Sequence, residues 1–396
     1  MKIKVGIFFG GNSVEHEISV ISALQAMRAM DTDRYDIVPV YITHDDRFFT
    51  GEELKTIENF SDINGLLAKS QQVIPVKGKD RIDLYRFPFG MLNRKPVDYI
   101  DVSFPIVHGT NVEDGALQGY LKYMGVPMVG PDVMSSAVGM DKYVMKNLLR
   151  AEGIPVLDGM TISSYDFEDD EDAVLNSVEE RFSYPVIVKP VNLGSSVGIK
   201  IARDREGLRE AAAYAFEYAH CLLIERAITQ LREINCSVLG DTENAVASEC
   251  EEPFNTDEIL SYEDKYMSSS SSKGMASVKR KLPADISEEL REQIRSLAVR
   301  TFRAMRCTGV VRIDFMIDGE DNTVYVNEAN TIPGSLSFYL WKESGMEYKE
   351  LLNRLIDLAF KRAREENAIS YEIETNILKG YSFGGAKGSK AKGGKI

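Results

Sequence analysis

VRIDFMIDGEDNTVYVNEAN, at residues 311–330, contains two runs of alternating polar and apolar residues on either side of the turn-forming sequence DGEDN. This alternation has the two-residue period of a β-strand, and the turn between the runs predicts an antiparallel hairpin. Successive side chains of a strand point to opposite faces, so Arg312 and Asp314 are expected to share one face, opposite Ile313. One face of the hairpin therefore carries a cation and a carboxylate within an apolar strand.

The second strand of the hairpin adds oxygen-bearing side chains. By alternation, Glu328 and Asn330 share one face, and Val324 and Val326 are expected on that face as well. Antiparallel pairing then gathers Asp314, Glu328 and Asn330 into one cluster. Crowded carboxylates resist ionisation unless a cation compensates, and Mg²⁺ binds one or two carboxylates together with phosphate oxygens. The alternative is a set of edge-strand polar residues that face water.

A second candidate site is the stretch KPVNLGSSVG at residues 189–198. Lys189 ends a β-branched strand, and the backbone of a glycine-containing loop can approach a ligand closely. Its N–H groups and the hydroxyls of Ser195 and Ser196 are suited to phosphate oxygens. The sequence is not a P-loop, because it lacks G-x-x-x-x-G-K-[ST] and no helix follows directly. A plain hairpin turn is the alternative.

Two strand-to-helix junctions carry further candidates. In GGNSVEHEIS, at residues 10–19, Glu15 lies at a helix N-terminus, where a ligand meets free N–H groups and where this carboxylate could pair with an ammonium. The alternative is an acid that only caps the helix. In HGTNVEDGALQG, the chemically capable residues are His108, Glu113 and Asp114. We interpret His108 as a structural histidine rather than a proton-transfer group.

Composition restricts the class of protein. The 396 residues are 44% hydrophobic and 27% charged, and the formal net charge is 47 − 61 = −14. An extended nucleic-acid-binding surface is therefore not expected. No stretch approaches the roughly 18–20 apolar residues of a membrane helix, and the opening MKIKVGIFFGG is too short in apolar residues for a signal peptide. The four cysteines show no zinc or disulfide spacing, so we expect a cytoplasmic protein.

The order of predicted elements indicates an α/β protein whose C-terminal half is α+β. The chain opens as strand, loop, helix and strand, which predicts a parallel sheet, and VDYIDVSFPIVHG continues that sheet. EELREQIRSLAVRTFRAM and EYKELLNRLIDLAFKRAREEN predict amphipathic helices. LSYEDKYMSSSSSKGMASVKRKLPAD is expected to be a long mobile loop, and the Gly/Lys-rich tail a disordered segment.

The motifs converge on one family. From residue 3 to about 360 the chain resembles the D-alanine–D-alanine ligases of the ATP-grasp superfamily, through GGNSVEHEISVISA, HGTNVEDGALQGYLKYMGVPMVG, MDKYVMKNLLRAEGIPV, VIVKPVNLGSSVGI, LIER…REINCSVLG and RIDFMIDGEDNTVYVNEANTIPG. The resemblance implies an ATP-grasp fold with a Rossmann-like parallel N-terminal domain and two α+β subdomains that enclose ATP. The implied boundaries are 1–130, 131–220 and 221–370, followed by a tail at 371–396.

The resemblance also implies a role for individual residues. For ATP it implies Lys265 on the γ-phosphate, Lys142 and Lys189 on the phosphates, Ser195 and Ser196 over them, Glu233 at the ribose and Glu225 at the adenine. For the reaction it implies Glu15 on the ammonium of the first substrate, Arg312 at the tetrahedral intermediate, Ser195 near the substrate and Tyr266 closing the site. For the metal it implies two Mg²⁺ ions, replaceable by Mn²⁺, on Asp314, Glu328 and Asn330.

The implied activity is the ATP-dependent formation of D-alanyl-D-alanine for peptidoglycan precursors. A carboxylate is a poor electrophile, so it first takes the γ-phosphoryl group of ATP, and an amine then attacks the acyl phosphate. The alternative is a sister ligase that uses D-serine, D-lactate or another small acid as acceptor. A non-catalytic ATP-binding protein is disfavoured because all the implied metal and phosphate residues are present. A homodimer is implied by the resemblance alone.

The departures from the family concern the acceptor side. After NTIPG, the family has a longer segment with a serine for the acceptor carboxylate, whereas SLSFYLW follows here. Gly334 and either Ser335 or Ser337 are the candidates for that role. HGTNVEDG lacks the family's usual glycines, and the predicted mobile loop ends in SVKRKLPAD. The acceptor therefore stays open in the sequence, although Tyr266 favours an amine.

Overall fold

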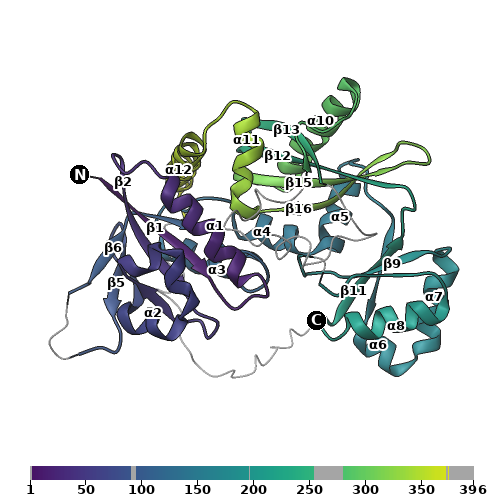
Figure 1. Ribbon diagram of the computed structural model, residues 1–396, viewed down its shortest axis with the longest axis horizontal. Helices are drawn as coiled ribbons and strands as arrows, with labels where there is room; N and C mark the ends of the chain where they lie inside the picture. The colour runs from purple at the N-terminus through teal and green to yellow at the C-terminus, as the bar shows by residue number, and fades with distance from the viewer. Residues whose placement is uncertain (1, 91–94, 196, 254–279, 372, 374–396) are drawn as a thin grey trace, which may run out of the picture.

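The computed structural model describes residues 2–90, 95–195, 197–253, 280–371 and 373, which form three β-sheets with helices packed around them (Figure 1). The first sheet occupies one end of the molecule, and the second lies at the opposite end. The third sheet lies between them in the upper part of the view. The predicted mobile loop and tail fall almost entirely outside the described residues.

The first sheet has seven strands in the order β6-β5-β4-β3-β2-β1-β7. Their bounds are β1 Ile3–Gly10, β2 Tyr35–Ile42, β3 Phe48–Thr50, β4 Gln71–Lys77, β5 Ile82–Arg86, β6 Asp98–Ile100 and β7 Val102–Pro105. The predicted parallel arrangement is correct for β2, β1 and β7. Within the predicted segment VDYIDVSFPIVHG, β6 instead pairs antiparallel with β5, and β3, β4 and β5, which were not predicted, also pair antiparallel. The helix α1 (His16–Ala29) supplies the long crossover that parallel pairing of β1 and β2 needs, whereas the short connection from β2 to β3 allows only an antiparallel pair.

The turn from β1 into α1 depends on glycine. Gly10 and Gly11 have φ values of +88° and +102°, which side-chain-bearing residues rarely adopt. A Cβ at Gly10 would lie 2.3 Å from the Ile42 carbonyl oxygen. The turn therefore brings the start of α1, with Glu15 at its N-cap, directly over the end of the parallel strands. Four further elements complete this region: η1 Glu52–Lys55, η2 Ile57–Ser61 and the short helices α2 Ile63–Lys69 and α3 Ala116–Met124.

The second sheet is a four-stranded antiparallel sheet in the order β10-β9-β11-β8. Its strands are β8 Gly159–Ser163, β9 Val186–Pro190, β10 Lys200–Ala202 and β11 Cys221–Arg226, and its helices are α6 Ser164–Asp169, α7 Glu171–Arg181 and α8 Arg205–Ala215. Leu175 and Val178 of α7 and Leu208 of α8 share a buried core with Val186 and Val188 of β9. The glycine- and serine-containing stretch joins β9 to β10, so it is topologically a hairpin connection.

The third sheet has five antiparallel strands in the order β14-β13-β12-β15-β16. They are β12 Leu231–Gly240, β13 Ala245–Pro253, β14 Arg280–Lys281, β15 Gly309–Asp318 and β16 Val324–Asn330. The predicted amphipathic helix is present as α10 (Glu288–Ala304), and Ile294, Leu297, Ala298 and Phe302 belong to the core beneath the sheet. Helices α4 (Val133–Met140) and α5 (Lys142–Ala151) precede the second sheet in the chain.

The chain ends by returning to the first sheet. After η4 (Gly334–Ser337) and α11 (Phe338–Glu343), the predicted long helix forms α12 (Tyr348–Asn367). Leu351, Leu352, Leu355 and Ile356 of α12 belong to the core of the first sheet. The Arg362 guanidinium also donates hydrogen bonds to the carbonyl groups of Gly130 and Met128. The C-terminal helix α12 therefore packs against the N-terminal region and joins it to the rest of the chain.

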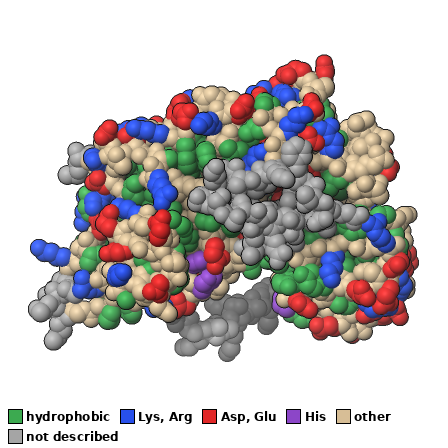
Figure 2. Space-filling view, in the orientation of Figure 1, with side chains coloured by type: hydrophobic (Ala, Val, Ile, Leu, Met, Phe, Trp, Pro, Cys, Tyr) green, Lys and Arg blue, Asp and Glu red, His purple; other side chains and the backbone are tan. Residues whose placement is uncertain are grey.

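The domain boundaries stay a prediction. Met145 and Leu149 of α5 lie in the core of the third sheet although they fall within the implied central subdomain. No helix in the described part of the chain is long and apolar enough to span a membrane. On the face in Figure 2, the Lys and Arg side chains are interspersed with Asp and Glu side chains.

Candidate active site

A single cavity of about 220 Å³ is bounded by elements from all three sheets. Its wall contains, among the described residues, five cations and six carboxylates: Lys142, Lys189, Arg226, Arg280, Arg312, Glu15, Glu113, Glu233, Glu251, Asp314 and Glu328. Apolar side chains line the part near β11 and β12, including Ile187, Ile228, Leu231 and Met316. A cavity with one apolar part and one highly charged part suits a ligand that carries a flat apolar group and an anionic chain.

The hairpin of β15 and β16 brings the predicted metal-binding residues together, but through a β-bulge. Asp314 lies opposite Glu328, and the pairing register then shifts so that Phe315 lies opposite Val326. The extra residue in the second strand is Asn327. The prediction that Val324 and Val326 share the face of Glu328 is therefore wrong, because both valines lie in the core beneath the sheet. A bulge turns successive side chains toward the same side, so Asn327 and Glu328 both line the cavity.

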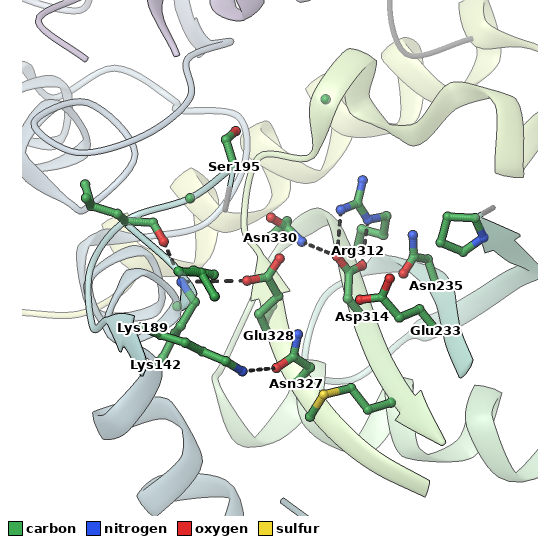
Figure 3. Close-up of a pocket in the computed structure, with 18 of the residues that line it drawn as sticks. Lys142, Lys189, Ser195, Glu233, Asn235, Arg312, Asp314, Asn327, Glu328 and Asn330 are labelled. Carbon is green, nitrogen blue, oxygen red and sulfur yellow. Dashed lines mark hydrogen bonds and ion pairs between the residues drawn. The ribbon is translucent and has the colours of Figure 1, made fainter. Parts of the chain in front are cut away.

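Arg312 and Asp314 form a bidentate ion pair at the centre of this cluster (Figure 3). The Arg312 Nε and Nη2 atoms lie 2.6 Å from the two carboxylate oxygens of Asp314. Asn330 Nδ2 donates to Asp314 Oδ2 over 3.0 Å. Burial raises the pKa of Asp314 to about 6. The ion pair with Arg312 lowers this pKa, but the neighbouring carboxylates of Glu328 and Glu251 raise it further. The site therefore holds more carboxylate than one guanidinium neutralises.

These residues fit a divalent cation. Two carboxylates and an amide oxygen are hard ligands, and Mg²⁺ takes one or two carboxylates and completes its shell with water and phosphate oxygens. Among the described residues no group of three or more His, Cys, Asp or Glu side chains is arranged so that it could hold a metal ion by itself. Asp314 and Glu328 are therefore a pair of carboxylates completed by Asn330, a set that is suited to a metal that also binds the ligand.

Two lysines face the metal-binding candidates across the cavity. Lys142 Nζ donates to the Leu193 carbonyl oxygen over 2.6 Å and lies 3.7 Å from Glu328 Oε2. Lys189 Nζ lies 3.4 Å from Asn327 Oδ1. Figure 3 shows both ammonium groups directed toward the β16 side chains. The structure thus places both implied phosphate-binding lysines at the charged part of the cavity.

Glu225 lies behind these lysines and not in the cavity. It is fully buried, and its carboxylate binds Lys189 Nζ at 2.9 Å and Lys146 Nζ. Burial alone raises the pKa of such a carboxyl, but the two ammonium groups hold the pKa of Glu225 well below its usual range. Glu233, on the neighbouring β12, does line the cavity beside its apolar part. Glu233, implied at the ribose, is therefore accessible from the cavity, whereas the Glu225 carboxylate holds Lys146 and Lys189 in place.

The loop after β9 reaches the start of α1. The Ser195 hydroxyl donates a hydrogen bond to the Glu15 carboxylate, and Ser195 has a φ of +55°. A Cβ at Gly194 would lie 2.8 Å from Glu15 Oε2, so a larger residue would push this carboxylate away. The loop is thus both a hairpin connection and one wall of the cavity, and it holds together two residues implied at the first substrate.

His108 and Glu113 lie in the same region and are satisfied by hydrogen bonds. His108 Nε2 lies 2.9 Å from Ser22 Oγ, and burial lowers the pKa of His108 to about 4. The Glu113 carboxylate accepts hydrogen bonds from the Gly109 and Ile332 amides, at 3.0 and 2.9 Å. Asp114 accepts a hydrogen bond from the Asn111 amide in the loop. These contacts favour structural roles for all three, although His108 and Glu113 also line the cavity.

The predicted acceptor residues are separated by the structure. Gly334 lines the cavity. Ser335 and Ser337 are fully buried and are not among the described residues that line it. Ser335, Leu336 and Ser337 have φ values of +52°, +54° and +49°, a left-handed turn, and the Ser335 amide donates to Ser22 Oγ over 2.9 Å. Ser196, Lys265 and Tyr266 lie outside the described residues, so their roles stay predictions.

Sequence reasoning missed several residues that shape the cavity: Asn235, Asn327, Lys146, Glu251, Arg280 and Tyr339. Asn235 carried a signal, since it lies two residues after Glu233 in a strand and shares its face. Asn327 carried none, because a bulge cannot be read from alternation. Arg280 and Tyr339 belong to two of the three stretches in which the sequence departs from the family pattern.

Comparison with known proteins agrees with this geometry. Residues 4–131 match the model of the D-ala D-ala ligase N-terminus, and residues 148–357 match that of the D-ala D-ala ligase C-terminus. A D-alanine–D-alanine ligase of Thermosipho africanus is 39% identical over 377 residues, covering 95% of this chain and 98% of the relative. The corresponding protein of Caldicellulosiruptor bescii is 40% identical over 382 residues, covering 94% and 99%.

Solved structures show the same relationship. The D-alanine-D-alanine ligase from Coxiella burnetii superposes with a TM-score of 0.76 at 31% identity, covering 93% of this chain and 96% of its own. The VanG D-Ala:D-Ser ligase from Enterococcus faecalis gives a TM-score of 0.76 at 29% identity, covering 91% and 100%. The predicted ATP-grasp fold is therefore confirmed. The chain belongs to the D-alanine–D-alanine ligase family.

Proposed function

We propose that this protein joins two D-alanine molecules into D-alanyl-D-alanine at the cost of one ATP, for peptidoglycan precursors. The observation that carries the proposal is the convergence of two lysines, two carboxylates with an amide, Arg312 and Glu15 on one cavity. Each of these groups suits a step of carboxylate activation followed by amine attack. The family assignment makes the protein an ATP-dependent ligase, and the names of its curated relatives favour D-alanine over other acceptors.

The nucleotide occupies the cavity from its apolar part to the lysines. The base lies among Ile187, Ile228, Leu231 and Met316, with Glu233 at the ribose. The phosphates then reach Lys142 and Lys189, whose ammonium groups offset the charge of the transferred phosphoryl group. Glu225 holds Lys189 in place from behind. The side chain of Glu225 therefore positions a phosphate ligand.

Asp314, Glu328 and Asn330 would hold Mg²⁺, which Mn²⁺ can replace. The metal supplies Lewis-acid stabilisation of phosphate oxygens, and two carboxylates with one amide match its preference for oxygen ligands. The raised pKa of Asp314 supports this assignment, because a cation relieves the repulsion that burial and the neighbouring carboxylates impose. Asn327 lies close enough to Lys189 to align its ammonium group with this cluster.

The first D-alanine binds at the start of α1. Its ammonium pairs with Glu15, which Ser195 orients by a hydrogen bond. A carboxylate oxygen attacks the γ-phosphorus, so that an oxygen–phosphorus bond forms, the bond from the γ-phosphorus to the bridging oxygen breaks, and ADP leaves with that oxygen. The unprotonated amine of the second D-alanine then attacks the acyl carbon, the peptide bond forms, and phosphate leaves. Arg312 and the backbone at Gly334 are suited to stabilise the oxyanion of the intermediate.

The setting of the enzyme follows from its substrates. ATP and D-alanine are small cytoplasmic molecules, and we infer that the enzyme acts there as a homodimer, as the family resemblance implies. Light scattering of the purified protein tests the dimer. A monomer at the concentrations of the activity assay would remove this part of the proposal and would leave the catalytic assignment unaffected.

The direct test is product analysis. The purified protein is incubated with ATP, Mg²⁺ and D-alanine, alone and with D-serine or D-lactate, and the products are identified by mass spectrometry alongside ADP release. D-alanyl-D-alanine from D-alanine alone supports the proposal. A mixed product that forms in preference to it, or ADP release only with a second acid, would transfer the assignment to a ligase with another acceptor.

A further inference from the structure

Two of the three stretches in which the sequence departs from the family pattern meet in the fold. Arg280, in SVKRKLPAD, forms β14 at one edge of the third sheet, and Tyr339, in SLSFYLW, lies in α11. The guanidinium carbon of Arg280 lies 3.9 Å from the centre of the Tyr339 ring, which is a close cation–π contact. Arg280 lines the cavity. The departures are therefore parts of one local structure in the cavity wall.

A buried carboxylate joins them. Glu251 of β13 accepts hydrogen bonds from Arg280 Nη1 at 2.8 Å and from the Tyr339 hydroxyl at 2.8 Å. Asn235 Nδ2 of β12 donates to the same carboxylate over 3.1 Å. The side chains of Arg280 and Glu251 are only 11% and 3% exposed. We call these four residues, Arg280, Glu251, Tyr339 and Asn235, the Arg280 cluster. Its hydrogen bonds fix the plane of the guanidinium.

The position of the Arg280 cluster follows from the register of the third sheet. Glu251 lies opposite Asn235, Asn235 lies opposite Asp314, and Asp314 lies opposite Glu328. These four residues form a row across the sheet, with the metal-binding candidates at one end. Neighbouring strands are about 4.8 Å apart, so the backbone of Glu251 is on the order of 10 Å from that of Asp314. The space between Asp314 and the Glu251 end of the Arg280 cluster is therefore about as long as one bound amino acid.

A cation in this part of the cavity suits the second substrate. An amino acid acceptor presents its amine to the acyl carbon, and its carboxylate must bind on the side away from the transferred phosphate. Of the five cations that line the cavity among the described residues, Lys142 and Lys189 face the phosphate end. Arg226 lies near the apolar part, where it pairs with Asp318, and Arg312 lies beside the metal-binding candidates, where it pairs with Asp314. Arg280 is paired as well, with Glu251, but among the described cations of the cavity wall it alone lies at the β14 edge.

The serines expected for this role do not reach the cavity. Ser335 and Ser337 are buried in the left-handed turn, and the Ser335 amide is bonded to Ser22. The shorter segment after the turn instead directs α11 toward β13, where Tyr339 contacts both Arg280 and Glu251. The segment that holds both candidate serines thus also supplies a tyrosine that supports a guanidinium.

We propose that Arg280 binds the carboxylate of the acceptor amino acid, with Tyr339 and Glu251 as positioning residues that hold its guanidinium in the cavity wall. This proposal rests on the proposed function, since it assigns a subsite of that reaction. A planar guanidinium binds a carboxylate through two parallel hydrogen bonds, which an ammonium or a hydroxyl cannot do. Arg280 therefore selects acceptors that carry a free carboxylate.

A competition between two acceptors tests this assignment. The full chain is incubated with ATP, Mg²⁺, D-alanine and D-alaninamide, and the ratio of D-alanyl-D-alanine to D-alanyl-D-alaninamide is measured by mass spectrometry. D-alaninamide has no carboxylate, so it cannot be the donor, and both products arise from the same acyl phosphate. The ratio therefore reports acceptor selection alone. We expect Arg280→Met to lower it at least about tenfold, the effect of one charge-assisted bidentate contact.

The chain offers a matched control. Arg232 of β12 binds Glu252 of β13 through two hydrogen bonds, at 2.9 and 3.0 Å. Arg232→Met therefore removes a cross-strand Arg–Glu pair one residue away in β13, where alternation turns the side chains to the other face of the sheet. We expect this variant to keep the wild-type product ratio. A wild-type ratio in Arg280→Met as well would overturn the proposal.

Other outcomes also decide the question. Loss of both products in Arg280→Met, with ATP binding and melting temperature retained, would assign Arg280 to activation of the donor and overturn the proposal. If Arg280→Met does not fold, Arg280→Lys supplies the test, because it keeps the charge but not the planar fork, and we expect an intermediate ratio. A wild-type protein that makes no dipeptide from D-alanine would refute the proposed function before any variant is compared.

Discussion

The two edges of the third sheet show two ways of building a binding surface. At the β15–β16 edge, the side chains are held by buried ion pairs and by a bulge, and the candidate residues could be read from the sequence. At the β13–β14 edge, Arg280 is also held by a buried ion pair, with Glu251, but its guanidinium is positioned in addition by the Tyr339 ring from a distant part of the chain. In the proposed function the first edge binds the phosphates, which every member of the family shares as part of ATP. The second edge faces the part of the reaction in which ligases differ.

The largest effect on stability is expected behind the phosphate-binding end. Glu225→Gln leaves Lys146 and Lys189 buried without a carboxylate, which should lower the free energy of unfolding by about 3–5 kcal/mol. Asp158→Asn is the control, because it breaks an exposed ion pair with Arg181 and should cost at most about 1 kcal/mol. Urea unfolding of both variants measures the difference. Equal effects would show that the buried charge of Glu225 adds no stability beyond that of an exposed ion pair.

Arg312 lies on β15, beside the metal-binding candidates, and its loss should affect the rate. In the proposed function its guanidinium faces the intermediate, so Arg312→Met should lower kcat by roughly 10²–10³-fold, as for the loss of an oxyanion donor. ATP affinity should change little, because the proposed phosphate ligands are Lys142 and Lys189 and not Arg312. Steady-state kinetics and nucleotide titration measure both quantities. Full activity in this variant would remove Arg312 from the chemistry.

The donor end should respond to pH through His108. Burial lowers the pKa of His108 from 6.5 to about 4, so the folded protein resists a proton that the unfolded chain accepts. His108 therefore contributes stability that is present above pH 6.5 and is lost as the pH falls toward 4. The amount is at most about 3 kcal/mol. The pKa of Glu113, raised from 4.5 to about 8 by burial, acts with the opposite sign, since its contribution to stability is lost as the pH rises from about 4.5 to about 8.

The check on His108 is a difference between two proteins. Urea midpoints of the wild type and of His108→Asn are compared at pH 7.5 and at pH 4.5. We expect the variant to be less stable at both values but to lose less stability between them. Identical pH dependence in the two proteins would show that His108 is protonated at little cost in the folded state.

The smallest effect is expected beneath the Arg280 cluster. Trp341 of α11 donates from Nε1 to Ser237 Oγ over 3.0 Å, so Trp341→Phe should cost about 1 kcal/mol of stability. Combining it with Ser237→Ala in a double-mutant cycle isolates this hydrogen bond. A coupling energy near zero would mean that α11 is held by packing alone, and that Tyr339 is positioned by its own contacts.

The site residues that could be predicted share a local signal. Lys189, Ser195 and Glu15 belong to stretches whose glycines and polar residues occur together in the chain, and Arg312 and Asp314 follow strand alternation. The structure brings these five together at one cavity. The prediction failed at Val324 and Val326, because a bulge at Asn327 changes which face the later residues occupy. The implied contact of Glu225 with the adenine stays a prediction, and the structure adds that its buried carboxylate binds Lys146 and Lys189.

The sequence by itself determined the family, the strands and helices that carry the motifs, and the residues suited to ATP and metal, because each depends on the order and spacing of nearby residues. Only the tertiary structure decided that four strands of the first sheet run antiparallel and that α12 packs on the N-terminal core. It alone brought Arg280 to Tyr339. The physical reason is that such contacts join segments distant in the chain, so their geometry depends on how whole sheets pack and not on any local pattern.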